Sequence, residues 1–232
     1  MAGDTILDLD GMRSRQLAGA ASGTVIDLKV GPGELILIDA RDADLGRGFA
    51  DICCGLIMPD AGDVAFLGRQ WHSLPHLYAD ALRGRIGRVF AGSSWISHLD
   101  AATNILLPQL HHTRREPAEL RAEAAELCRH FGLPGLPTGA IASLSDGDRV
   151  RAGFVRAVLG EPMLLLLESP VQGLYADVVP MLLNCIAAAR DRGAAAIWMT
   201  RSKLVWSDRT FPATQRLRLG YHGLSPVRGN QG

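Results

Sequence analysis

The pattern of apolar and polar residues divides the chain into candidate strands and helices. Apolar and polar positions alternate over residues 4–10 and 24–30, which predicts strands with one buried face. Continuous apolar runs at 35–38, 163–167 and 194–200 predict strands that are buried on both faces, as in a parallel sheet. Two shorter strands are predicted at 64–67 and 85–90.

Helical spacing is clearest between residues 117 and 131. This segment starts with Pro117 and places Leu120, Ala124 and Leu127 at the intervals of one helix face. Further helices are predicted at 49–57, 148–159 and 178–190, and a polar loop is predicted at 39–48.

Strands that alternate with helices predict an α/β fold with a parallel core sheet. A mainly helical block at residues 100–160 interrupts this alternation, which predicts a helical subdomain to one side of the core. The expected division is an N-terminal part of the core at 1–95, a helical subdomain at 96–160, a C-terminal part of the core at 161–222, and a flexible, Gly/Ser/Pro-rich tail at 223–232.

Composition narrows the function classes. Of the 232 residues, 47% are hydrophobic, enough for a sizeable core. Lys and Arg number 24 and Asp and Glu also 24, so the zero net charge gives no reason to expect a nucleic-acid partner. The four cysteines lack metal-binding spacing and are expected to be buried. Residues 1–14 do not resemble a secretory signal, and the apolar run at 163–167 is too short to span a bilayer, so we expect any membrane role to come through a partner.

The segment 144–170, LSDGDRVRAGFVRAVLGEPMLLLLESP, carries the strongest motif. It combines a Leu-Ser-x-Gly turn, an arginine-bearing helix and an apolar strand that ends in an acid. This order resembles the signature-to-Walker-B segment of ABC-transporter ATP-binding subunits. Residues 55–64 (GLIMPDAGDV) match the same family in order and spacing, and the resemblance extends from residue 24 to residue 219. It implies a P-loop NTPase-like ABC ATPase fold, with a mixed or parallel core sheet and a helical subdomain, and it implies ATP with Mg²⁺ as the cofactor.

The phosphate loop of this family reads Gly-x-x-x-x-Gly-Lys-Ser/Thr. Its glycines turn backbone N–H groups toward the phosphates, its lysine binds the β- and γ-phosphates, and its hydroxyl binds Mg²⁺. Counting from Gly33 and from Gly55 places residues 40–47 (ARDADLGR) in this register. The candidate nucleotide-contacting positions are therefore Ala40, Leu45, Gly46, Arg47 and Gly48.

These positions lack the parts that phosphate binding uses. The lysine position holds Gly46 and the hydroxyl position holds Arg47, while Asp42 and Asp44 add negative charge where phosphates would lie. Like charges in a partly desolvated loop disfavour phosphate binding. Arg47 is the candidate for a substitute cation, and the alternative is a solvated arginine on an ordinary loop.

The other catalytic motifs are also altered. Glu168 and Ser169 stand where the family has Asp and Glu at Walker B; Glu168 keeps a possible metal-binding carboxylate, whereas Ser169 cannot act as a base at neutral pH. Loss of one well-placed electrostatic group lowers a rate by about 10²–10³. The Q-loop glutamine is replaced by Ala91, and the switch histidine by Arg201.

The signature turn keeps two of its residues. Ser145 and Gly147 persist, but Asp146 and Asp148 bring carboxylates to a turn that in the family faces the γ-phosphate bound by the other subunit of a dimer. At a helix N-terminus such carboxylates act as a cap and interact favourably with the helix dipole. We therefore expect a structural role for this turn, while completion of a partner's ATP site stays open.

The resemblance and the replacements together predict a pseudo-ATPase. We expect a subunit at the cytoplasmic face of a membrane, peripheral to it through a transmembrane permease, and paired with a competent ABC ATPase subunit as a heterodimer. Residues 93–99 are the candidate coupling surface to the permease. The alternatives are a non-transport scaffold or regulatory protein on the same fold, and an ABC ATPase with an unconventional site that uses Arg47 and Glu168.

Overall fold

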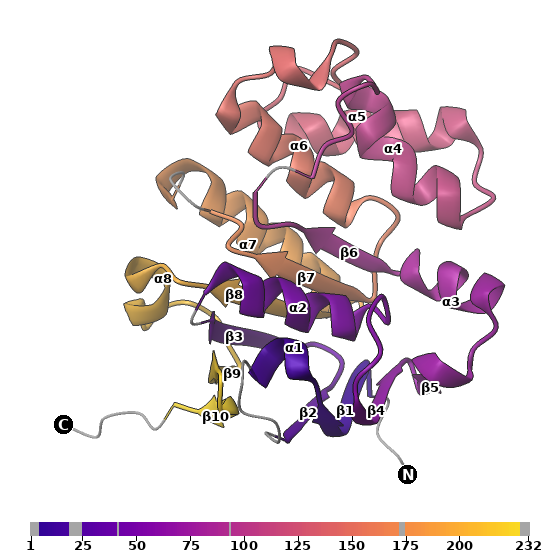
Figure 1. Ribbon diagram of the computed structural model, residues 1–232. Coiled ribbons are helices and arrows are strands. Elements are labelled where there is room, and N and C mark those ends of the chain that lie inside the picture. Colours follow the sequence, from indigo (N-terminus) through magenta and orange to yellow (C-terminus); the bar gives the residue numbers. More distant parts are fainter. Residues whose placement is uncertain (1–4, 19–24, 41, 93, 172–174, 228–232) are drawn as a thin grey trace.

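A mostly parallel six-stranded sheet forms the centre of the computed structural model, which describes residues 5–18, 25–40, 42–92, 94–171 and 175–227 (Figure 1). The strands β3, β6, β7, β8 and β9 pair in parallel, and β10 closes one edge antiparallel to β9. Their order across the sheet is β10 (Gly223–Pro226), β9 (Gln215–Gly220), β3 (Leu35–Ala40), β8 (Ala195–Thr200), β7 (Leu164–Glu168) and β6 (Ile86–Val89).

A second, antiparallel sheet lies beside the core sheet, at the bottom of Figure 1. Its order is β2 (Ile26–Val30), β1 (Leu7–Arg13), β4 (Ala61–Phe66) and β5 (Arg69–Gln70). The helix α2 (Ala43–Cys53) packs Phe49 and Ile52 into one hydrophobic core with side chains of both sheets, such as Val64 and Ile197. This packing fixes the position of α2 relative to the core strands.

The two faces of the core sheet bury different residues of the same strands. In β3, Ile36 and Ile38 face the core that contains α2, whereas Leu35 and Leu37 face a second core that contains α7 (Tyr175–Asp191). Side chains alternate between the faces of a strand, so a strand covered on both sides needs a continuous apolar run. The continuous runs in the sequence therefore correctly predicted doubly covered strands.

Helices gather beyond the edge strand β6, at the top of Figure 1. Gly87 allows close contact there, because a Cβ at this position would lie 1.9 Å from the carbonyl oxygen of Ala157 on α6. The helices beyond this edge are α4 (Ala101–His112), α5 (Pro117–His130) and α6 (Asp146–Val158), and the remaining helices are α1 (Arg15–Ala18), α3 (His76–Arg83) and α8 (Lys203–Ser207).

The prediction of a loop at 39–48 was wrong for most of its length. α2 begins at Ala43 and ends at Cys53, several residues earlier than the predicted helix at 49–57. Glycine has a low helix propensity, so Gly46 and Gly48 favoured the prediction of a loop, but both lie in α2. The helix begins after its N-cap Asp42, whose side chain accepts a hydrogen bond from the Leu45 N–H.

Other predicted boundaries also moved. β1 covers Leu7–Arg13 instead of residues 4–10, and residues 223–226, predicted as part of a flexible tail, form β10 against β9. α3 and α4 were not predicted as separate helices, and α4 contains Pro108. The predicted strands at 35–38, 163–167 and 194–200 and the helix at 117–131 are confirmed within a few residues.

Candidate functional site

The predicted site residues come together where β3 and β7 end and α2 begins. β3 ends at Ala40 and β7 ends at Glu168, and both strands pair with β8 in parallel. Parallel strands bring their carboxyl ends to one edge of the sheet, which is where open α/β sheets bind ligands. The topology therefore places the phosphate-loop and Walker B positions at the same edge.

The N-terminus of α2 is capped by the side chain of Asp42, the residue before the helix. Asp42 accepts a hydrogen bond from the N–H of Leu45 at 2.8 Å with Oδ1, and from the hydroxyl of Tyr221 at 2.9 Å with Oδ2. The bond from Leu45 is the largest cause of a lowered Asp42 pKa, and Tyr221 and the charge of Arg201 lower this pKa further against partial burial. A carboxylate thus already lies at the positive end of this helix.

The remaining phosphate-loop positions differ in how far they are buried. Ala40 and Leu45 are buried, and Gly46 is buried near Met199. Arg47, the candidate substitute cation, is half exposed, and its nearest acid is Asp44 at 3.9 Å. The Gly48 position faces Leu17 of α1, and Arg41 lies outside the described residues.

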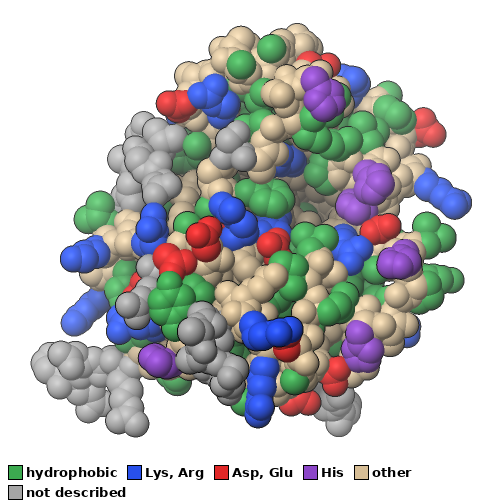
Figure 2. Space-filling model, viewed as in Figure 1, with side chains coloured by type: hydrophobic (Ala, Val, Ile, Leu, Met, Phe, Trp, Pro, Cys, Tyr) green, Lys and Arg blue, Asp and Glu red, His purple; other side chains and the backbone are tan. Residues whose placement is uncertain are grey.

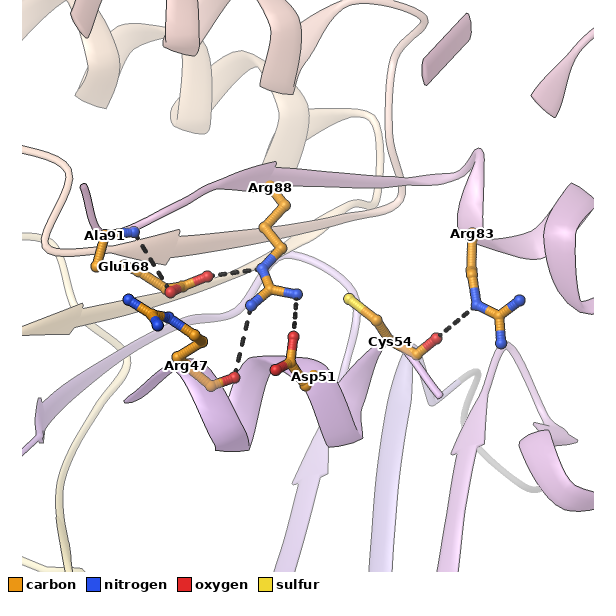
Figure 3. Close-up of polar contacts among 7 residues, drawn as sticks. All are labelled: Arg47, Asp51, Cys54, Arg83, Arg88, Ala91 and Glu168. Atoms are coloured by element: carbon orange, nitrogen blue, oxygen red, sulfur yellow. Dashed lines mark hydrogen bonds and ion pairs between the residues drawn. The ribbon is translucent and has the colours of Figure 1, made fainter. Parts of the chain in front are cut away.

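Glu168 is held by a buried ion pair that the sequence motifs do not predict (Figure 3). The Nε of Arg88, on β6, donates to Oε1 of Glu168 at 2.6 Å, and the two side chains are only 7% and 2% exposed. The Nη1 of Arg88 also donates to Oδ1 of Asp51 on α2 at 2.6 Å. One guanidinium therefore joins β6, β7 and α2.

The other replaced catalytic positions lie in different surroundings and contribute no catalytic group. The backbone N–H of Ala91 lies 3.3 Å from Oε2 of Glu168, so the Q-loop position contributes only its backbone. Ser169 has a left-handed φ of 45° and donates its N–H to the carbonyl of Met199 at 2.8 Å. Arg201 is exposed.

The signature turn begins α6, but its cap is Ser145; Asp146 and Asp148, which were predicted to cap the helix, lie in its first turn. Ser145 is the N-cap of α6: its hydroxyl accepts from the N–H of Asp148 at 3.1 Å and donates to the Asp148 carboxylate at 2.8 Å. Asp146 is almost fully exposed and pairs with Arg149. Gly147 lies in the first turn of α6 close to Arg151.

Two cavities meet at Phe90 and Arg156, between the core sheet and the helices beyond β6. The larger, of about 530 Å³, is lined by Ser94, Trp95 and Ser97, among other residues, and the smaller, of about 190 Å³, by Leu56. Figure 2 shows the surface hollowed between the upper helical part and the lower sheet part, with basic side chains along the hollow. We call these cavities together the Phe90 groove.

Arg156 has no acidic partner among the described residues. It donates to the carbonyl and hydroxyl oxygens of Ser94 at 3.2 and 2.5 Å, and its Cζ lies 4.2 Å from the centroid of the Trp95 ring. Burial lowers the Arg156 pKa to about 10, so this arginine stays charged at neutral pH. It is a partly buried cation without a counterion in the described chain.

Sequence reasoning missed Arg88 and Tyr221. One signal was present for Arg88, because it is the one charged residue of IGRV at 86–89, inside the predicted strand. A buried arginine needs an acidic partner, but the sequence does not show which acid it meets. Tyr221 gave no signal, because it lies 179 residues from Asp42 in the chain.

The fold and site define the class of protein. A helix that starts after β3, an acid at the end of β7 and a Leu-Ser-x-Gly turn at the start of α6 are arranged as in ABC-type ATP-binding cassettes. The family model described as "ABC transporter" matches residues 49–172, more than half of the chain, so the chain belongs to the ABC transporter family. The matched range begins just after the altered phosphate loop.

Curated relatives agree with this family. The chain is 30% identical over 208 residues to the lipoprotein-releasing system ATP-binding protein LolD of Maricaulis maris, covering 86% of this chain and 89% of LolD. It is 35% identical over 150 residues to the methionine import ATP-binding protein MetN of Mesorhizobium japonicum, covering 64% of this chain. It is 28% identical over 199 residues to the sn-glycerol-3-phosphate import ATP-binding protein UgpC of Chromohalobacter salexigens, covering 85% of this chain. The chain spans only 40% of the length of MetN and 52% of the length of UgpC.

Solved structures show the same fold. The dimeric bacterial ABC transporter cassette MJ0796 superposes with a TM-score of 0.80 at 20% identity, covering 96% of this chain and 99% of that one. A post-hydrolysis structure of MJ0796, bound to ADP and Pi, gives the same TM-score at 19% identity and the same coverage. The predicted fold class, an ABC ATPase fold with a mixed, mostly parallel core sheet, is confirmed.

Proposed function

We propose that this chain is a non-hydrolysing cassette subunit of an ABC transporter, which transmits movement between a membrane permease and a second, ATPase-competent subunit. ATP hydrolysis requires a metal ion, a water-activating group and donors to the γ-phosphate, all held in place together. In this chain most of the corresponding side chains are replaced, and the remaining carboxylate, Glu168, is held in an ion pair with Arg88.

The single observation that carries the proposal is the buried ion pair between Arg88 and Glu168. Both carboxylate oxygens of Glu168 already have donors, from Arg88 at 2.6 Å and from the N–H of Ala91 at 3.3 Å. A Mg²⁺ ion next to Glu168 would have to displace a tethered, buried guanidinium. Ser169, the next residue, offers no base to activate water. Mg²⁺ therefore does not fit this site, and we derive no catalytic step through it.

The phosphates of ATP fit no better. The Asp42 carboxylate lies at the N-terminus of α2 and is held there by Leu45 and Tyr221. A phosphate at this helix end would meet a carboxylate whose lowered pKa keeps it charged. No lysine is available at Gly46 to offset that repulsion. We therefore propose that ATP binds weakly or not at all.

The proposed contact with the permease is the Phe90 groove. It includes Ser94, Trp95 and Ser97 of the predicted coupling surface at 93–99; Ser93 itself lies outside the described residues. Arg156 presents a partly buried positive charge with no described acid partner, which a carboxylate of the permease would neutralise. The helical part predicted at 96–160 would then move with the permease.

The proposed location is the cytoplasmic face of a membrane, reached through this permease. No helix among the described residues is long and apolar enough to cross a membrane.

One pair of assays tests the absence of ATP use. The purified chain is titrated with ATP and Mg²⁺ by calorimetry, and phosphate release is measured at millimolar ATP. We expect neither saturable binding nor release above the buffer rate. Micromolar binding that Arg47→Ala abolishes would favour an ABC ATPase with an unconventional site and would overturn the proposal.

Affinity purification from detergent-solubilised membranes tests the partners. We expect the chain to recover a permease together with an ATPase subunit that has an intact lysine-bearing phosphate loop, and Arg156→Asp to lower the recovery at least tenfold. Lys203→Asp, an equal charge reversal on the exposed helix α8, serves as the control and should leave recovery unchanged. Recovery of soluble proteins alone would favour a scaffold or regulatory role.

A further inference from the structure

Oxygen atoms converge on the Arg88 guanidinium from two elements of the core (Figure 3). Glu168 Oε1 and Asp51 Oδ1 each lie 2.6 Å from a guanidinium nitrogen, and the carbonyl oxygen of Arg47 lies 3.5 Å from Nη2. Two carboxylates and a backbone carbonyl are the ligand types that hard divalent cations prefer. The chain thus builds an oxygen-lined position and fills it with its own cation.

The guanidinium is well held in this position. Charge-assisted hydrogen bonds of this length are stronger than neutral ones, and two of them share one planar group. The Arg88 Cζ also lies 4.4 Å from the centroid of the Phe90 ring, which covers the guanidinium on one side. Burial lowers the Arg88 pKa, but Cys54, Glu168 and Asp51 raise it more, so the group stays charged.

We infer that Arg88 is a metal-excluding residue, which occupies the place of a divalent cation between Glu168 and Asp51. Shortening this side chain to a neutral one opens a latent cation site made by the two carboxylates and the Arg47 carbonyl. The inference deepens the proposed function, because it names the residue that removes the metal from the site. It rests on the contacts of Arg88 and needs no nucleotide.

Substitution of Arg88 by a neutral residue would change how the chain responds to divalent cations. Removing Arg88 takes away the cation that Glu168 and Asp51 each contact at 2.6 Å, and leaves two negative charges without it. A divalent cation would replace this positive charge and stabilise the variant in proportion to its concentration. The wild-type chain already has this compensation and should not respond.

The test is a titration of the full chain with Mn²⁺, in the absence of nucleotide, followed by the paramagnetic resonance signal of free Mn²⁺. The variants are Arg88→Ala, Arg88→Ala with Glu168→Gln, and Arg88→Ala with Asp51→Asn. We expect no site in the wild type at about 1 mM Mn²⁺. We expect one site per chain in Arg88→Ala, weakened at least tenfold by either second substitution. Melting temperature with and without Mn²⁺ should rise only for the variant that binds.

Two results would overturn the inference. One is Mn²⁺ binding by the wild type that Glu168→Gln removes, since Arg88 would then not exclude the metal. The other is a folded Arg88→Ala chain that binds no Mn²⁺. Should Arg88→Ala not fold, Arg88→Gln, which keeps a polar side chain without charge, is titrated instead with the same two outcomes. ATP hydrolysis by the wild type would refute the proposed function through a different assay, so the two failures are distinguishable.

Discussion

Two arginines lie against the same aromatic ring but have opposite surroundings. The Cζ atoms of Arg88 and Arg156 lie 4.4 and 5.5 Å from the centroid of the Phe90 ring. Arg88 contacts two carboxylates at 2.6 Å, whereas the partners of Arg156 among the described residues are the oxygens of Ser94 and aromatic rings. The first charge is compensated inside the molecule and the second is not.

This difference distinguishes Arg88, whose charge is paired within the protein, from Arg156, whose charge is open to another molecule. A buried charge must be paired or it destabilises the fold, so the acids around Arg88 make it part of the core. Arg156 lies at the wall of two open cavities, where a group from another molecule can reach it. The space between Glu168 and Asp51 is therefore filled by Arg88, and we propose that Arg156 in the Phe90 groove is the charge that meets a partner.

The largest expected effect comes from breaking the Arg88 pair from one side. Glu168→Leu leaves the buried guanidinium with one acid and should lower the free energy of unfolding by about 3–5 kcal/mol. The double variant Glu168→Leu with Arg88→Met should recover at least half of this loss, because the two most buried charges are then both removed and only Asp51, whose side chain is 22% exposed, loses its partner. Urea denaturation of the four chains gives the coupling; additive losses would show that the pair is not buried as described.

The next largest effect concerns the close contact between β6, the strand that contains Arg88, and α6. Gly87→Ala places a methyl group 1.9 Å from the Ala157 carbonyl oxygen and 2.8 Å from a Leu165 methyl, so β6 must shift. Overpacking of this kind costs about 1–3 kcal/mol. Gly135→Ala, where nothing lies within 4 Å, is the matched control and should change little. Equal urea midpoints for the two variants would argue against the close contact.

A smaller effect concerns the helix cap that stands where phosphates bind in the family. Asp42→Ala removes the acceptor for the Leu45 N–H and should cost about 0.5–2 kcal/mol. The folded Asp42 pKa is lowered. Its stabilising contribution is therefore fully present above the unfolded pKa of about 3.9 and is lost as pH falls through the folded pKa.

Asp42→Asn distinguishes the contribution of the capping hydrogen bond from that of the negative charge. Asp42→Asn keeps a good N-cap acceptor, so stability at pH 7 should stay close to that of the wild type, but the acid-dependent part should disappear. Urea midpoints measured from pH 7 down to pH 3 check this. An unchanged acid dependence in Asp42→Asn would assign the effect to another carboxylate.

The smallest stability effect is expected on the other side of Phe90. Arg156→Met removes the contacts to Ser94, Trp95 and Phe90 but also relieves an uncompensated charge, so the net change should be less than about 1 kcal/mol. Its urea midpoint is compared with that of Glu168→Leu. A loss as large as for Glu168→Leu would mean that Arg156 serves the fold and not a partner.

Sequence patterns were most successful where burial is uniform. The runs at 163–167 and 194–200 became β7 and β8, and the signature turn at Ser145 became a helix cap. The predicted loop at 39–48 was wrong for most of its length, because two glycines of low helix propensity lie in a helix that is capped by Asp42. The sequence left open whether Arg47 is a substitute cation or a solvated arginine; its side chain is half exposed, and the cation that contacts Glu168 is Arg88.

By itself the sequence determined the family and the buried strands at 35–38, 163–167 and 194–200, and it predicted the replacement of catalytic side chains, because these depend on residue types at fixed spacing. Only the tertiary structure decided what fills the site. Arg88 lies 80 residues from Glu168 and 37 from Asp51, and Tyr221 lies 179 residues from Asp42. From a charged residue in a predicted buried strand, the sequence indicates that this charge needs a partner. Which residue becomes the partner depends on which strands are neighbours in the sheet.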